Sequence, residues 1–505
     1  MESQEINRGL ERNALSLFDA VMAGLAQMAP AFSILFTAAF IAGIAGASVP
    51  LVFLLATIGI LATGNALAQF SREWPSAGSF VTFIARAIGP RVSLVVAITA
   101  LLGYIIAFGG VYIFVGDYIV NEVFGDPGIP LFTQFITIMF GALVTLPVIL
   151  GVRVGVRVAV AMYLFEVAVF AVFTIAVLVQ GGATGLSLEP FALPAGGLGP
   201  IALGFALAVL AFVGFEAPAP LAEETRDPRR NVPIALMACI LINGALYVLA
   251  SYALVAAFGN DGTRLGEDSA PFVTASQEFI APLALIVVWI LLSSVVGSYV
   301  AANTETARVI YNTAREGLLA RSLARLHPRY RTPWLAAIAF VAPSVLLGVG
   351  STIFTDPGTA SGFLGTLGTL GIIVMYAMTN VALIVHWARQ RASGGRRRVF
   401  SWLIVPLAGV AILGVPLWYN LQPGQDPPFN LMPVLLPLLI LVSVAYMLYV
   451  QRSKPQLLAR AGSIMMGEST SEESFQSRSE AGAADAPGEN KSESETTVKE
   501  DGRDG

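Results

Sequence analysis

Charged side chains are scarce in this 505-residue chain. They make up 12% of the residues, whereas hydrophobic residues make up 56% and the mean hydropathy is +0.74. A soluble globular protein carries roughly 25% charged residues, so half that density leaves too little polar surface to face water. The composition therefore indicates a membrane protein.

Residues that commonly carry chemistry are scarce as well. The single cysteine, Cys239, excludes a disulfide within the chain, and two histidines, His327 and His386, cannot build a histidine-based metal cluster. No G-x-x-x-x-G-K-[ST] phosphate loop occurs, which argues against an ATP-driven pump. There is no basic excess of the kind that nucleic-acid binding needs. We expect no cofactor, no metal and no enzymatic activity.

Long apolar runs, in contrast, are abundant. About 20 apolar residues span the roughly 30 Å hydrocarbon core as a helix. Twelve stretches qualify: 17–43, 50–70, 92–116, 131–151, 157–179, 199–221, 233–257, 280–303, 334–350, 362–387, 401–420 and 430–450. These runs are apolar all round, whereas the strands of a membrane β-barrel would alternate. The sequence thus predicts an all-α integral membrane protein with twelve transmembrane helices between residues 17 and 451.

The positive charges predict how these helices are oriented. With the N-terminus inside, the inner connections hold 24 Lys and Arg residues and the outer ones hold one, Arg264. Cytoplasmic loops retain positive charge, so residues 1–16 and 452–505 are expected in the cytoplasm of a multi-pass plasma-membrane protein. No cleavable signal peptide is expected, because the first apolar run is too long. The tail, with 11 acidic and 4 basic residues in 468–505, is expected to be disordered, as a solvating appendage or a docking segment.

Two predicted spans are interrupted at mid-membrane. In the first, residues 24–32 place Pro30 among small residues, roughly 16 to 22 Å from the inner end. In the sixth, residues 211–220 combine glycine, two prolines, two phenylalanines and a carboxylate. These spans correspond if 17–179 and 199–387 are inverted repeats, with 401–450 as two extra helices. Either span alone could simply be kinked by proline, but two interruptions at corresponding positions favour a substrate site at the midplane of the membrane.

Two carboxylates, Glu166 and Glu216, lie well inside the predicted spans. An ionisable group inside the membrane is costly, and a low dielectric favours its neutral form, so each is a candidate proton carrier. The alternative is a permanently protonated glutamate that hydrogen-bonds backbone freed by the helix break. The aromatic side chains of Phe212, Phe215 and Tyr104 are candidates to line or gate a pocket, with ordinary packing as the alternative.

Several motifs resemble one known family. The sequence from 214 to 216, followed by LAEETRDPRRNVP at 221–233, resembles the sixth-span signature of amino acid permeases of the amino acid-polyamine-organocation (APC) superfamily. The PSAGS sequence at 75–79, GVR at 151–153 and the loop from 308 to 333 resemble the family as well. The resemblance covers spans one to ten.

This resemblance implies a five-plus-five inverted repeat of leucine-transporter type, with broken helices 1 and 6 and two C-terminal helices. In such proteins, backbone groups of both broken helices bind the amino acid's head group. Carried onto this chain, the positions are Gln27, Met28, Ala29, Pro30, Ala31, Phe212, Val213, Gly214 and Phe215. Two features depart from the family: a glycine-rich element is replaced by APAF at 29–32, and Glu166 stands where some proton-coupled relatives have lysine.

We therefore expect a secondary active transporter that takes up amino acids or related amines by alternating access, with protons as the coupling ion. An exchanger of the same fold and a transporter-like sensor are the alternatives. No Lys or Arg lies deep in any span, so N–H groups beyond residues 27–31 are the expected partners of a substrate carboxylate. If amines that lack a carboxylate bind as well, Glu216 or Glu166 is expected to pair with the cation.

Overall fold

The structure is a computed structural model that describes residues 15–75, 78–151, 156–315, 317, 319–394, 398–453 and 455. For 156–159, 223, 283, 285 and 291 it describes the backbone alone. The chain divides into two units, Met1–Met466 and Gly467–Gly505, and all described residues belong to the first. Most of the predicted cytoplasmic segments, 1–14 and 456–505, therefore lie outside the described residues, as do 76–77, 152–153, 316 and 318 of the family motifs.

The described residues form helices and connections, without a β-strand. The α-helices are α1 (Leu17–Gln27), α2 (Pro30–Ala45), α3 (Val49–Glu73), α4 (Ser79–Ala87), α5 (Pro90–Tyr118), α6 (Phe132–Leu150), α7 (Val156–Gln180), α8 (Leu198–Phe212), α9 (Pro228–Ala257), α10 (Gly262–Glu267), α11 (Pro271–Phe279), α12 (Ala284–Arg315), α13 (Trp334–Ser351), α14 (Pro357–Ala392), α15 (Val405–Asn420) and α16 (Met432–Ser453). Shorter turns of helix are η1 (Gly46–Ser48), η2 (Ile119–Val123), η3 (Glu189–Phe191), η4 (Pro220–Glu223), η5 (Ala281–Leu283), η6 (Arg321–Ala324), η7 (Phe400–Ile404) and η8 (Phe429–Leu431).

Ten helical stretches of the described chain are long and apolar enough to cross a membrane. The first, Leu17–Glu73, is 57 residues long and contains two of the predicted spans. The predicted sixth span corresponds to a shorter apolar helix, α8. The chain is therefore an all-helical, multi-pass membrane protein, as the hydropathy pattern predicted.

Local sequence explains where several helices begin. Ser16 caps α1, because its hydroxyl accepts the N–H of Asp19 at 3.3 Å while the Asp19 carboxylate accepts the N–H of Ser16 at 2.9 Å. Helices α5, α9, α11 and α14 each begin with proline, whose missing N–H costs nothing at a first helical position. Asp356 caps α14 by accepting the N–H of Thr359 at 2.8 Å.

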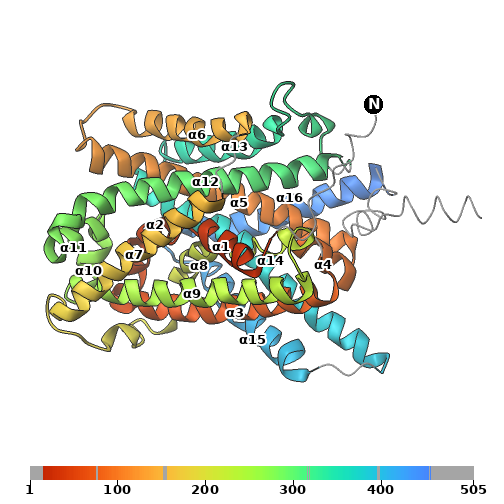
Figure 1. The fold of residues 1–505 in the computed structure, drawn as a ribbon, viewed down its shortest axis with the longest axis horizontal. Helices are drawn as coiled ribbons and strands as arrows, with labels where there is room; N and C mark the ends of the chain where they lie inside the picture. Colours follow the sequence, from red (N-terminus) through yellow and green to blue (C-terminus); the bar gives the residue numbers. More distant parts are fainter. Residues whose placement is uncertain are drawn as a thin grey trace, which may run out of the picture. The chain divides into compact units, whose positions relative to one another are not determined.

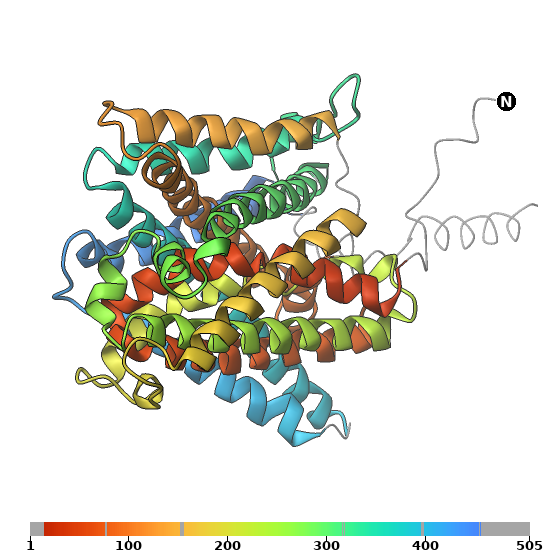
Figure 2. The ribbon, with the colours of Figure 1, turned by 60° about the vertical axis from the view of Figure 1, so that its left-hand side comes forward.

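Glycine allows the closest helix packing. A Cβ atom on Gly103 of α5 would lie 2.7 Å from the carbonyl oxygen of Gly368 on α14, so small residues let these two backbones touch. Helices far apart in sequence also run side by side, α3 with α9 and α6 with α13 (Figure 1, Figure 2). At one end of α1, the N–H of Leu15 donates to the carbonyl of Glu224 and that of Arg226 to the carbonyl of Leu15, each at 2.9 Å. The start of α1 is thereby tied to the chain that follows α8.

Candidate functional site

The first helix interruption lies between α1 and α2. Gln27 ends α1, and Ala29 has φ of 42°, a left-handed conformation that is uncommon for a residue with a side chain. Pro30 then starts α2, where it cannot donate a hydrogen bond. The Ser33 hydroxyl donates to the carbonyl of Met28 at 2.7 Å. The break therefore leaves polar backbone atoms within a long apolar segment.

The second interruption follows α8, which ends at Phe212. Gly214 has φ of +107°, and a Cβ atom at this position would lie 3.0 Å from Cγ and 3.1 Å from the carbonyl carbon of Gln27. Glycine is required here both for the backbone conformation and for the close approach to the first break. The two interruptions are consequently in direct contact.

A cavity of about 60 Å³ lies beside these two breaks. It is lined by Gln27, Met28, Ala29, Phe32, Ser33, Phe36 and Thr37 near the first break, Phe108 and Val111 of α5, Leu210, Ala211 and Val213 near the second break, and Ser298, Tyr299 and Ala302 of α12. One water needs roughly 10–15 Å³ of such space, so the cavity holds several waters or a ligand of a few heavy atoms. Its walls are mostly apolar, with polar groups contributed by the breaks.

Aromatic rings form one wall of this cavity. The ring of Tyr299 packs edge-on against Phe32, with centroids 6.1 Å apart, and lies 4.9 Å from Phe108. Phe32 also stacks on Phe36 at 5.9 Å. Ring faces attract cations, so this wall is suited to a positively charged or apolar group.

A further carboxylate within a candidate membrane span, Glu305, reaches the first break from α12. Its Oε2 accepts a hydrogen bond from the side-chain amide of Gln27, which lines the cavity. Glu305 is not among the residues singled out from sequence, because the predicted span 280–303 ends two residues before it. The helix instead continues to Arg315. A predicted span that was allowed to continue through polar residues in its last turns would have included Glu305.

Glu216 lies among hydroxyl donors on the other side of the second break. Its Oε1 accepts a hydrogen bond from Tyr104 of α5 at 2.8 Å, and its Oε2 accepts one from the backbone N–H of Gly214 at 3.1 Å. The hydroxyl of Tyr376 on α14 lies 3.3 Å from Oε2. Glu216 is not among the residues that line the cavity. The Glu216 side chain therefore links the second break to α5 and α14 by hydrogen bonds.

Glu166 of α7 is buried, with 5% of its surface exposed, and contacts the first break. Its Oε2 accepts a hydrogen bond from the backbone N–H of Ala31 at 3.4 Å, in the first turn of α2. A carboxylate at this position is favoured by the partial positive charge of a helix N-terminus. Each broken segment thus contacts a carboxylate of the protein itself.

The structure separates the residues singled out from sequence into three groups. Gln27, Met28, Ala29 and Val213 line the cavity. Pro30, Ala31, Gly214, Tyr104, Glu166 and Glu216 lie in or against the breaks without lining it. Phe212 and Phe215 are fully buried and pack on tyrosines, Phe212 against Tyr247 and Phe215 against Tyr376.

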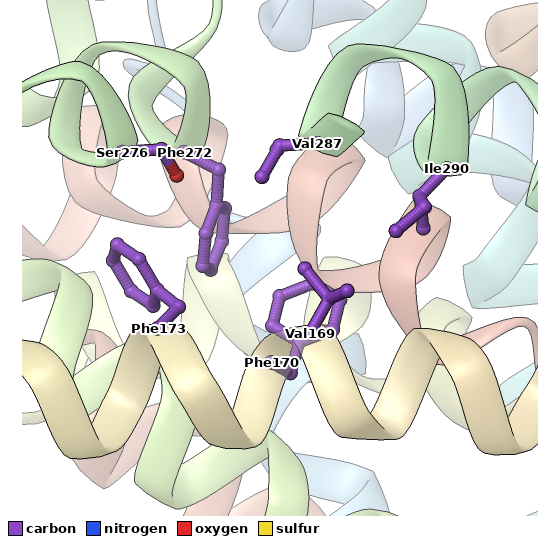
Figure 3. Close-up of a pocket in the computed structure, with 7 residues that line it drawn as sticks. All are labelled: Val169, Phe170, Phe173, Phe272, Ser276, Val287 and Ile290. Carbon is purple, nitrogen blue, oxygen red and sulfur yellow. The ribbon is translucent and has the colours of Figure 1, made fainter. Parts of the chain in front are cut away.

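A second, smaller pocket lies between α7, α11 and α12 (Figure 3). The side chains that line it are carbon apart from the hydroxyl of Ser276, and its volume is about 10 Å³. That is room for one water at most. This pocket therefore offers neither the space nor the polar groups that the larger cavity has.

Comparisons with known proteins bear on the whole membrane region. A family model described as "Amino acid permease" matches residues 15–445. The low-affinity putrescine importer PlaP of Escherichia coli is 27% identical over 426 residues, which cover 81% of this chain and 89% of the importer. The branched-chain amino acid permease BcaP of Bacillus subtilis is 26% identical, covering 73% and 79%, and the methylthioribose transporter of the same organism is 24% identical, covering 83% and 90%.

Proposed function

The chain belongs to the amino acid permease family, and we propose that it imports an amino acid or a related amine across the plasma membrane by proton-coupled alternating access. Permeases move their solutes chemically unchanged, so the chain is a transporter and not an enzyme. The observation that carries the proposal is the cavity of about 60 Å³ where the two helix breaks meet. Two of the relatives are a putrescine importer and a branched-chain amino acid permease, and their solutes, a diamine and amino acids, agree with this range.

We base the proposed twelve-helix inverted repeat on helix pairing. Helix α2 packs on α8, α3 on α9 and α6 on α13. If Leu17–Glu73 contributes spans one and two and α8 is span six, each of these pairs joins spans that are five apart: one with six, two with seven and four with nine. Elements close to a pseudo-two-fold axis contact their symmetry mates, so this pairing supports two repeats of five helices. The Lys and Arg distribution supports cytoplasmic termini.

Alternating access then follows from what the broken helices can do. Short half-helices can tilt about a break without disrupting a full-length helix, which opens the cavity to one side at a time. Glu216 and Glu166 each hydrogen-bond to a broken segment, so a change in their protonation alters what holds that segment in place. This link between proton and backbone is the proposed basis of coupling.

The proposal is tested with the full-length protein in proteoliposomes. Uptake of labelled putrescine and labelled leucine is measured with an acid-outside pH gradient, with a sodium gradient and with neither. Uptake that accumulates either solute only under the pH gradient supports proton coupling. Accumulation that needs unlabelled solute inside the liposome identifies an exchanger, and binding without flux identifies a sensor.

A further inference from the structure

The first turn of α2 has few backbone donors to offer a solute. Pro30 has no N–H, and the N–H of Ser33 donates within the helix to the carbonyl of Ala29 at 2.9 Å. The first N–H groups of a helix normally have no partner within the helix, and at this helix start those that remain belong to Ala31 and Phe32. A solute carboxylate that binds at this helix start would have to use these two groups.

One of these two donors is already taken by the protein. The N–H of Ala31 donates to Oε2 of Glu166, whose side chain is 95% buried. A solute carboxylate placed here would have to compete with the Glu166 side chain for the Ala31 N–H, and it would meet a like charge at close range whenever Glu166 is ionised. Glu166 therefore fills the place that a solute carboxylate would need.

The second break shows the same arrangement. The N–H of Gly214 donates to Oε2 of Glu216, and those of Phe215 and Ala217 donate to backbone carbonyls at 3.1 Å each. Pro218 has no N–H to offer. This break consequently presents few donors to a solute anion either.

The cavity itself is suited to a cation. Among the described residues that line it, none is Lys, Arg or His. The aromatic wall of Phe32, Phe108 and Tyr299 attracts an ammonium group, and Gln27 connects the cavity to the carboxylate of Glu305. An alkyl-ammonium solute finds both kinds of partner here, whereas a carboxylate finds no counter-charge.

We propose that Glu166 is a specificity-determining residue, which occupies the start of α2 as a built-in carboxylate and restricts transport to primary amines that carry no carboxylate. The inference rests on the proposed transport function and narrows its solute class. Glu166 acts by exclusion, because a carboxylated solute must displace it from Ala31 before it can bind. An amine makes no such demand.

The experiment compares amino acids with the amines obtained by removing their carboxyl group. Three matched pairs are used: leucine with 3-methylbutylamine, methionine with 3-(methylthio)propylamine, and ornithine with putrescine. Thermal stabilisation of the full-length protein in detergent and uptake into proteoliposomes are measured for each compound. We expect each amine to act at a concentration at least tenfold lower than its amino acid. Amino acids that bind as well as their amines would overturn the inference and leave the proposed transport function intact.

Glu166→Gln and Glu166→Ala test the residue itself. Glu166→Ala frees the Ala31 N–H, and Glu166→Gln keeps an acceptor for it but removes the negative charge. In both variants the preference for amines should shrink, by about tenfold in Glu166→Ala, mainly because amino acids bind better. Glu189 is an exposed carboxylate outside the site, so Glu189→Gln is the matched control. It should keep the native preference for amines over amino acids. An unchanged preference in both Glu166 variants would overturn the role of Glu166. If neither the amines nor the amino acids bind to or cross with the native protein, the transport function and this inference are overturned together.

Discussion

The hydroxyl of Tyr104 donates a 2.8 Å hydrogen bond to the carboxylate of Glu216, 112 residues further along the chain. This contact joins the middle of α5 to the chain immediately after α8, where the second helix break lies. Because Glu216 also accepts the N–H of Gly214, the hydroxyl, the carboxylate and the break form one connected group. Its role in transport can be tested from each end.

The first prediction is that Glu216→Gln abolishes the pH dependence of net uptake. Glutamine has nearly the same size but cannot exchange a proton, so solute binding should survive while acid outside no longer accelerates uptake. Initial rates in proteoliposomes over external pH 5 to 8 provide the measurement. If the variant keeps the native profile, proton coupling belongs to Glu166 or to no group in this pair.

The second prediction concerns Tyr104→Phe, which removes one hydrogen-bond donor from Glu216. A bond to a charged acceptor contributes roughly 1.5–3 kcal/mol, so the uptake rate should fall roughly tenfold or more. Tyr376→Phe is the matched comparison, because its hydroxyl lies further from Glu216, at 3.3 Å, and its loss should have a smaller effect. If the two substitutions lower the uptake rate equally, the shorter hydrogen bond from Tyr104 is not the more important one.

Part of this site was predictable from local sequence and part was not. The apolar runs indicated the membrane helices, and Pro30 and Gly214 indicated the two breaks, because proline and glycine act on the backbone where they stand. The partnership of Glu216 with Tyr376 depends on contact between residues 160 positions apart, which no local pattern encodes. Glu305 was missed because α12 continues through polar residues after Asn303, and hydropathy marks where apolar sequence ends, not where a helix ends.

The third prediction tests contact between the two breaks. Gly214→Val should abolish binding of the solute with the protein still folded, because its Cβ would crowd Gln27 and its φ of +107° disfavours any side chain. Ala29→Val should act in the same way, since Ala29 is left-handed and valine is β-branched. Gly43→Ala on α2 is the control, with no atom within 4 Å of the added carbon. Size-exclusion profiles verify folding, and native binding in both valine variants would refute the prediction.

The fourth prediction concerns stability rather than binding. Gly103→Ala should lower the free energy of unfolding by about 1–3 kcal/mol, because its added carbon would meet the backbone of α14 2.7 Å from the Gly368 oxygen. Gly350→Ala in α13 has open space around the added carbon and is the matched control. The apparent unfolding temperature in detergent is the readout. Equal temperatures for both variants would mean that α5 and α14 separate easily enough to admit a methyl group.

The last prediction concerns Gln27 and Glu305, which join the cavity to α12. Gln27 donates a hydrogen bond to Glu305 and also lines the cavity. Substitution of either residue should therefore weaken solute binding through the loss of the same hydrogen bond. A double-mutant cycle with Gln27→Leu and Glu305→Leu should give a coupling free energy of about 1 kcal/mol or more in solute binding, since each single change leaves a polar partner without its bond. Glu305→Gln keeps the shape but removes the charge, and it should weaken binding of putrescine more than binding of an uncharged analogue of equal length. Additive effects in the cycle, together with equal losses for the two solutes, would show that Glu305 contributes neither to the order of the first break nor to recognition of the cation.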